Sequence, residues 1–278
     1  MKVAVTGATG FIGRHVLARL NELGVDTTAV VRPTSTQIAT LRAHTVVQLD
    51  LHEAPPDSFE RMGCPDVLIH LAWDGLPNYQ SLHHFESELP AQYRFLRDLI
   101  CSGLPNLVVA GTCFEYGMQS GPLSVDDDTK PTNPYGFAKD SLRRKLQYLQ
   151  AQYPFVLSWA RLFYLYGEGQ SEASLFSQLR RAAEKGEKIF NMSGGEQLRD
   201  YLNIEDAAKQ LVLLALRNRN SSIVNVCSGR PISVRRLVEE WIEENGWTIT
   251  LNLGHYPYPD YEPMAFWGVI DKEKCSTN

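Results

Sequence analysis

Short apolar runs alternate with helical patterns over the first two-thirds of the 278-residue chain. The runs are almost continuously apolar, which is typical of parallel strands buried on both faces. They predict strands at residues 2–5, 26–31, 46–49, 67–72, 107–111 and 155–162. Apolar residues at helical spacing predict helices at residues 14–24, 81–100 and 135–150. This alternation favours an α/β fold with a parallel sheet and crossover helices.

Beyond residue 167 the pattern changes. Helices are predicted at residues 175–185, 204–216 and 234–244, with one short strand at 223–227. The segment 255–268 is rich in proline and aromatic residues and has no clear period. We therefore expect two parts, an N-terminal domain over residues 1–167 and a small mixed C-terminal lobe over residues 168–278. The boundary between them is approximate, and the chain can cross from one part to the other.

A glycine-rich turn joins the first predicted strand to the first predicted helix. Its glycines follow the spacing G-x-x-G-x-x-G over residues 7–13. Glycine allows a tight turn and lets the backbone approach a pyrophosphate that rests on the helix N-terminus. An ordinary strand-to-helix turn is the alternative. The dinucleotide interpretation expects cofactor contacts from Thr6, Gly7, Gly10, Phe11, Ile12 and Gly13.

The residue after the second strand bears on which dinucleotide is bound. In NAD-binding folds an acidic side chain about 20 residues beyond the glycine turn holds the ribose 2′-hydroxyl. Here Arg32 stands after that strand, followed by Pro-Thr-Ser. Because a guanidinium suits a 2′-phosphate, the sequence predicts NADP(H) as the preferred cofactor, with NAD(H) possible. The alternative is that Arg32 is a solvated loop residue.

A second constellation indicates redox chemistry at a carbonyl or alcohol. Tyr135 and Lys139 are four positions apart, on one face of a predicted helix. A phenol can donate a proton to a carbonyl, and a lysine one turn away favours the phenolate and can hydrogen-bond a cofactor ribose. Thr112 supplies a hydroxyl at the end of the preceding strand. We therefore expect Thr112, Tyr135 and Lys139 to be catalytic.

Together these motifs resemble the extended short-chain dehydrogenases/reductases, the family of NAD-dependent epimerases and dehydratases. The resemblance covers nearly the whole chain, with further matching segments at residues 70–72, 111–117, 161–167, 199–201 and 225–229. It implies a Rossmann-type doubly wound parallel sheet that binds the dinucleotide, and a C-terminal lobe that binds a nucleotide-linked sugar. It also implies cofactor contacts from Asp50, Leu51, Leu71, Ala72, Tyr135, Lys139 and Leu162.

Two departures from the family pattern narrow the reaction. The 4,6-dehydratases of the family carry Asp-Glu directly after the catalytic threonine, whereas this chain has Cys113 and Phe114, so dehydration is not expected. Tyr164 replaces the asparagine that the family usually places near the substrate. Arg199 resembles the arginine that contacts the substrate diphosphate, and a surface ion pair is the alternative role. The resemblance and the neighbourhood of Thr112 together suggest substrate contacts from Trp73, Thr112, Glu115, Tyr164 and Arg199.

The aromatic tail resembles the end of nucleotide-sugar 4-ketoreductases, such as the synthases of CDP-abequose, CDP-paratose and dTDP-fucose. This resemblance implies NADPH-dependent reduction of the C4 ketone of a nucleoside-diphosphate 4-keto-6-deoxyhexose. One alternative is a nucleotide-sugar 4-epimerase with tightly bound NAD. Another is a non-catalytic dinucleotide-binding sensor, for which a proton donor at Tyr135 would have no use.

Composition limits the remaining classes. The chain is 44% apolar and 21% charged, which is typical of a soluble domain. Its net charge of −5 does not favour binding to nucleic acid or to an anionic membrane. No apolar stretch is long enough to cross a bilayer, and the N-terminus reads as a strand, so we expect a cytoplasmic protein. The histidines show no ligand spacing, and we expect no metal. In the family the two long helices often pair across a dimer, which makes a homodimer the expected assembly.

Overall fold

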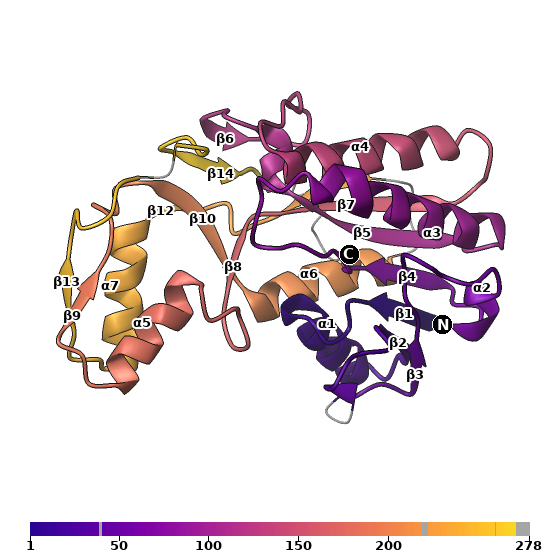
Figure 1. Cartoon of the computed structure of the whole chain (residues 1–278), viewed down its shortest axis with the longest axis horizontal. Coiled ribbons are helices and arrows are strands. Elements are labelled where there is room, and N and C mark those ends of the chain that lie inside the picture. The colour runs from indigo at the N-terminus through magenta and orange to yellow at the C-terminus, as the bar shows by residue number, and fades with distance from the viewer. Residues whose placement is uncertain (39–40, 218–221, 259, 271–278) are drawn as a thin grey trace.

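A computed structural model describes residues 1–38, 41–217, 222–258 and 260–270. Its centre is a seven-stranded parallel sheet with the strand order β11-β7-β5-β4-β1-β2-β3 (Figure 1). The strands are β1 (Lys2–Thr6), β2 (Asp26–Val31), β3 (Thr45–Gln48), β4 (Val67–His70), β5 (Asn106–Thr112), β7 (Val156–Leu162) and β11 (Ser222–Val226). This arrangement confirms the doubly wound parallel sheet predicted from the sequence.

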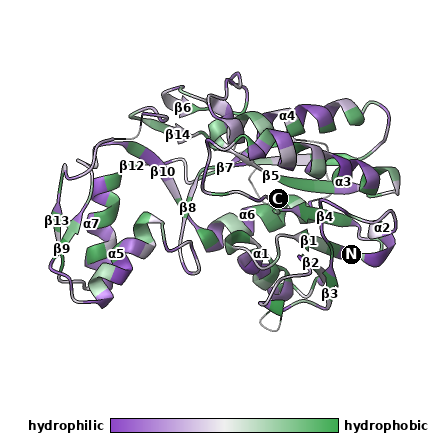
Figure 2. Ribbon diagram, viewed as in Figure 1, coloured by the Kyte–Doolittle hydropathy of each residue, from purple (hydrophilic) through white to green (hydrophobic). Residues whose placement is uncertain are grey.

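Helices cover both faces of the sheet. On one face lie α1 (Phe11–Glu22) and α6 (Ile204–Leu216), and on the other lie α3 (Leu89–Cys101) and α4 (Pro134–Leu149) (Figure 1). Each helix presents an apolar stripe to the strands, which are themselves largely apolar in Figure 2. Burial on both faces explains why these strands read as continuous apolar runs. The short helix α2 (Ser58–Arg61) precedes β4.

A smaller lobe stands beside the sheet, on the left in Figure 1. Its helices are α5 (Leu175–Glu184) and α7 (Val234–Asn245), and its strands are β9 (Ile189–Asn191) and β13 (Thr250–Asn252). They bury a separate core that includes Leu179, Phe190, Leu237 and Trp241. Two further short sheets lie between this lobe and the main sheet: β8 (Tyr164–Tyr166) with β10 (Leu198–Asn203) and β12 (Pro231–Ser233), and β6 (Gly121–Leu123) with β14 (Phe266–Gly268).

The boundary predicted at residue 167 does not divide the chain into two continuous units. After α5 and β9, the chain returns to the main sheet, where α6 packs beside α1 and β11 pairs with β7. Residues 168–278 therefore contribute both to the lobe and to the sheet. The apolar face of α6 explains the return, because Leu211 and Val212 are buried in the same core as Leu17 and Leu20 of α1.

None of the helices among the described residues is long and apolar enough to span a membrane.

Candidate active site

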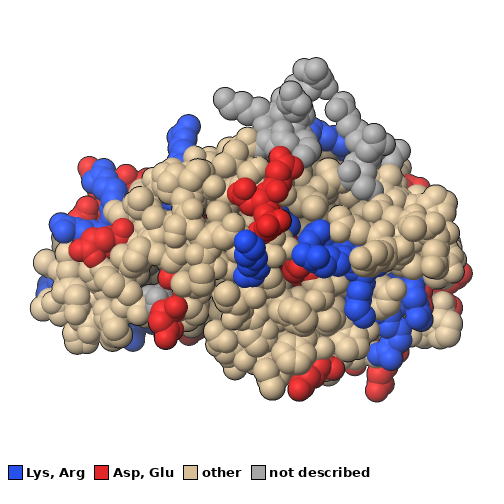
Figure 3. Space-filling model, turned by 90° about the horizontal axis from the view of Figure 1, so that it is seen from above, with Lys and Arg blue, Asp and Glu red and all other residues tan. Residues whose placement is uncertain are grey.

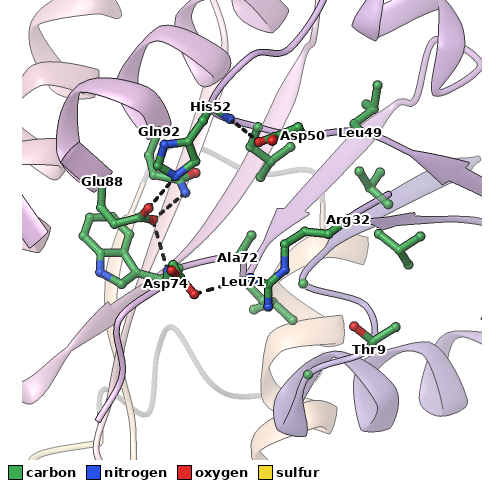
Figure 4. A pocket seen from close by; sticks show the side chains of 16 residues that line it. Thr9, Arg32, Leu49, Asp50, His52, Leu71, Ala72, Asp74, Glu88 and Gln92 are labelled. Atoms are coloured by element: carbon green, nitrogen blue, oxygen red, sulfur yellow. Dashed lines mark hydrogen bonds and ion pairs between the residues drawn. The ribbon is translucent and has the colours of Figure 1, made fainter. Parts of the chain in front are cut away.

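A cavity of about 340 Å³ opens at the carboxyl ends of four neighbouring strands (Figure 4). Its walls come from the residues that follow β1, β2, β3 and β4. The strand order reverses between β1 and β4, so the cavity lies at the topological switch point of the sheet. Ligands of open α/β sheets bind at this point.

The glycine turn forms one wall of this cavity and requires the absence of side chains. Gly7 has φ +66°, and a Cβ atom there would lie 2.9 Å from the backbone nitrogen of Ala72. A Cβ atom at Gly13 would overlap the carbonyl oxygen of Gly7. The N-cap of α1 is Gly10, which supplies no side-chain cap to the first backbone N–H groups. These N–H groups and the open backbone fit a dinucleotide pyrophosphate.

Thr6 fixes the loop that forms the opposite wall. Its hydroxyl oxygen accepts hydrogen bonds from the backbone N–H groups of Leu71 and Ala72 at 3.2 and 3.3 Å, and lies 2.9 Å from Nδ1 of His70. Burial, together with the charge of Lys139, lowers the pKa of His70 to about 3. His70 is therefore neutral and acts here as a buried hydrogen-bonding group.

Thr112, which the sequence predicted to be catalytic, is held by a local cap. Thr112 ends β5, and its hydroxyl accepts the backbone N–H of Phe114 at 3.3 Å. Its own backbone N–H donates to Oε1 of Glu115 at 2.9 Å, which completes a capping box for the 3₁₀ turn Cys113–Tyr116. This exchange of hydrogen bonds sets the orientation of the Thr112 side chain.

Glu115 lies beneath Thr112 and away from solvent. Its carboxylate accepts hydrogen bonds from Nε1 of Trp159 at 2.9 Å and from Nε of Arg161 at 2.8 Å, and the Glu115 side chain is fully buried. The sequence predicted that Glu115 contacts the substrate. Its placement instead favours a positioning role for Thr112, because its carboxylate is already engaged by groups of the protein.

Tyr135 and Lys139 lie on α4, next to Thr112. Asn133 caps this helix by accepting the backbone N–H of Gly136 at 2.8 Å. Burial raises the pKa of Tyr135, and a hydrogen bond with the Thr112 side chain opposes that shift. Nζ of Lys139 donates to the carbonyl oxygen of Ala110 at 2.9 Å. Burial lowers the pKa of Lys139 to about 7, although Glu115 and Glu88 oppose the shift.

Aromatic side chains surround Tyr135 and Lys139. Nζ of Lys139 lies 3.9 Å from the centroid of the Trp73 ring, a cation–π contact. Nε1 of Trp73 donates to Nδ1 of His84 at 3.1 Å, and the rings of His84 and Tyr79 lie 5.2 and 5.6 Å from that of Tyr135. Trp73 was predicted to contact the substrate. It lines the dinucleotide cavity and covers Lys139.

The other two predicted substrate residues lie together, at the junction with the small lobe. Arg199 is buried, and its Nη2 forms an ion pair with Oε2 of Glu262 at 2.9 Å. Tyr164 packs against Tyr201 and Phe266, with ring centroids 5.3 and 6.0 Å away. Burial raises the pKa of Tyr164, and the negative charge of Glu262 adds to this shift. Arg199 therefore forms a buried ion pair with Glu262 of the tail, and not the surface ion pair that was considered as its alternative role.

Sequence reasoning identified many of the residues that line the cavity. Among the predicted cofactor contacts, its lining includes Gly7, Gly10, Arg32, Asp50, Leu51, Leu71 and Ala72. The other predicted contacts lie outside the lining: Thr6, Phe11, Ile12, Gly13, Tyr135, Lys139 and Leu162. Sequence reasoning missed Thr9, His52, Asp74, Glu88 and Gln92. The spacing of four between Glu88 and Gln92 was the one available signal, since it places both on one helical face.

The fold and this site define a dinucleotide-binding α/β protein with a Thr–Tyr–Lys constellation. The family model of the NAD-dependent epimerase/dehydratase family matches residues 3–227. The chain belongs to this family, as the sequence motifs predicted.

Named relatives support this membership over the full length of the chain. It is 31% identical to the dTDP-6-deoxy-L-talose 4-dehydrogenase (NAD(+)) of Aggregatibacter actinomycetemcomitans, covering 96% of this chain and 99% of that protein. It is 24% identical to the UDP-glucose 4-epimerase of Halalkalibacterium halodurans, covering 100% of this chain and 89% of that protein. Among solved structures, MoeE5 in complex with UDP-glucuronic acid and NAD is 27% identical, with a TM-score of 0.81 over 99% of this chain and 92% of that one.

Proposed function

We propose that this protein is an NAD-dependent oxidoreductase that acts on the C4 hydroxyl of a nucleoside-diphosphate sugar. The observation that carries the proposal is the meeting of Thr112, Tyr135 and Lys139 beside a cavity at the switch point of the sheet. A relative that is 31% identical over nearly the whole chain is named a nucleotide-sugar 4-dehydrogenase that uses NAD(+).

The residues divide the chemistry between them. The glycine turn and the N-terminus of α1 would hold the pyrophosphate of the dinucleotide, and Lys139 its ribose. Bound nicotinamide supplies the hydride acceptor for C4, or the donor in the reverse direction. Thr112 holds the oxygen on C4, and Tyr135 takes up the proton of the C4 hydroxyl or returns it to the ketone. Burial favours the protonated phenol, and the nearby charge of Lys139 favours the phenolate.

A second candidate is a nucleotide-sugar 4-epimerase, which the sequence also left open. Several relatives are named UDP-glucose 4-epimerase, with identities of 24–27%. Both candidates begin with oxidation at C4, and they differ in whether the reduced cofactor leaves. The 4-ketoreductase predicted from the tail is the reverse of a 4-dehydrogenase. The comparisons do not confirm it, and neither do they confirm the predicted preference for NADP(H).

The substrate diphosphate is assigned to Arg199, on the family resemblance. A guanidinium suits two phosphate oxygens. The guanidinium of Arg199 forms an ion pair with Glu262. A diphosphate can therefore bind Arg199 only if the carboxylate of Glu262 moves aside. Trp73, Thr112 and Tyr164 are the other proposed sugar contacts.

A turnover assay with purified protein tests the proposal. NAD(+) is added together with each member of a panel of nucleotide sugars that differ in base and in C4 configuration, and absorbance at 340 nm and the sugar products are followed. Accumulation of NADH supports the dehydrogenase, while interconversion of C4 epimers without net NADH supports the epimerase. If the protein binds neither NAD(+) nor any nucleotide sugar, the proposal fails.

We also propose a homodimer formed through α3 and α4. Phe137 and Tyr148 on α4 are 50% and 80% exposed, which is unusual for aromatic side chains. Figure 3 views the molecule from the side on which α4 lies in Figure 1, and groups of charged side chains there alternate with larger uncharged areas. Light scattering should give twice the mass of the chain for the wild type and the mass of one chain for Tyr148→Arg. A monomeric wild type would refute the dimer.

A further inference from the structure

We propose that Asp74 forms an ion pair with the guanidinium of Arg32 and that this pair makes the cavity bind NAD(H) more tightly than NADP(H). This inference rests on the proposed dinucleotide site and adds a residue that determines cofactor specificity. It also explains how an arginine after β2 can stand in an NAD-type cavity.

The pair spans the mouth of the cavity. Arg32 follows β2, Asp74 follows β4, and both line the cavity (Figure 4). Nη1 of Arg32 lies 3.4 Å from Oδ1 of Asp74. Both side chains are more than half exposed, so the ion pair is weak. One substitution can therefore remove it and free the guanidinium of Arg32.

A buried carboxylate anchors the Asp74 backbone. The backbone N–H of Asp74 donates to Oε2 of Glu88 at 3.1 Å. Glu88 is itself fully buried, and it also accepts a hydrogen bond from Nε2 of Gln92 at 2.9 Å and contacts Nε2 of His52 at 2.5 Å. The backbone of Asp74 is therefore fixed beside the cavity, which places its exposed carboxylate within reach of Arg32.

The charges around this part of the cavity disfavour an additional phosphate. Three carboxylates, Asp50, Asp74 and Glu88, line it together with the guanidinium of Arg32. Nε2 of His83 also lies 3.9 Å from Oδ2 of Asp74. A 2′-phosphate carries up to about two negative charges, and an arginine recognises it through a free planar fork. With Asp74 in place, Nη1 of that fork lies against a carboxylate, so a 2′-phosphate beside Arg32 also meets the negative charge of Asp74.

The test is a fluorescence titration of the purified protein with NADH and with NADPH, in which the ratio of the two dissociation constants is the readout. The wild type should bind NADH more tightly. Asp74→Asn should shift the ratio toward NADPH by about fivefold, the scale of one exposed charge interaction. Arg32→Ala and the double variant Arg32→Ala/Asp74→Asn should lack this gain, because no guanidinium is released.

Asp206→Asn serves as a matched control, since it removes a carboxylate that is paired with Lys209 on α6. It should leave the ratio unchanged. An unchanged ratio in Asp74→Asn, or an equal gain in the Arg32→Ala background, would overturn the inference while leaving the proposed function intact. A wild type that binds neither dinucleotide would instead refute the proposed function.

Discussion

At the scale of single residues, the proposed chemistry depends on the hydroxyl of Tyr135. Tyr135→Phe removes the proton donor and acceptor but keeps the ring that packs against Tyr79 and His84. We expect turnover to fall by at least about 100-fold, the usual contribution of a positioned acid–base group. NADH affinity, measured by fluorescence, should stay within about twofold because the ring is kept.

Tyr148→Phe is the control for this substitution. It makes the same change at an exposed position of the same helix, and its turnover should match the wild type. If Tyr135→Phe turns over at the wild-type rate, the assignment of Tyr135 is wrong.

We expect the buried ammonium of Lys139 to lower the stability of the fold. Its pKa is lowered to about 7 by burial, so between pH 7 and its unfolded value of about 10.4 the unfolded state binds more protons. Below pH 7 Lys139 is charged in both the folded and the unfolded state, so the full cost of burying its charge lowers the free energy of unfolding. As the pH rises above 7, the folded protein buries a neutral amine and this cost shrinks. Lys139→Met should raise the free energy of unfolding by roughly 2–4 kcal/mol at pH 6, and by less than half of that at pH 9.5.

Chemical denaturation at the two pH values measures this gain. Lys145→Met, on the exposed side of the same helix, should show no such dependence on pH. A gain for Lys139→Met that is the same at both pH values would contradict the assigned cause.

Ion pairs around the site were the part that the sequence could not predict. The sequence predicted that Arg32 binds a 2′-phosphate, because it follows the second strand. It predicted that Glu115 binds the sugar, because it lies near Thr112. The structure pairs Arg32 with Asp74, 42 positions away, and Glu115 with Arg161, 46 positions away. Ion pairs between such distant positions are set by the tertiary fold, and no local pattern contains them.

At the scale of elements, the glycine turn and α1 form one unit. Gly13→Ala places a Cβ atom against the carbonyl oxygen of Gly7, which must then shift. Overpacking of this kind costs about 1–3 kcal/mol, and where that cost falls on the NADH-binding form of the turn, NADH affinity should fall by roughly 5- to 150-fold. Gly24→Ala, at the other end of the same helix, meets no atom within 4 Å and should leave NADH affinity unchanged. Equal NADH affinities in the two variants would show that the glycine turn does not hold the dinucleotide.

Elements of the main sheet were predictable because of how they are buried. Its inner strands are covered on both faces and therefore leave a continuous apolar run, as in β2, which was predicted with its observed bounds. The edge strand β3 is largely exposed. The strands around the small lobe are mostly three residues long and partly exposed, so they carry no such run. The longer strand β10 was also missed, because Arg199 and Asp200 break its apolar pattern although both are buried.

At the scale of the whole molecule, the chain crosses between sheet and lobe, which brings distant segments to one site. Thr112 and Tyr135 come from the first half of the chain, while Arg199 comes from β10 and Glu262 from the tail. The sequence allowed the chain to cross between its two parts, and α6 and β11 are the elements that return to the main sheet. Sugar chemistry at this junction is consistent with the oxidoreductase proposed above.

The proposed function requires hydride transfer at C4, and an isotope experiment follows that hydrogen from the substrate. A nucleotide sugar that the panel assay identifies as a substrate is prepared with deuterium at C4, incubated with the protein and NAD(+), and analysed by mass spectrometry. Hydride transfer never exposes this hydrogen to water, so the deuterium should be found in NADH or back on C4 of the sugar product. Loss of the deuterium to solvent during turnover would contradict the account.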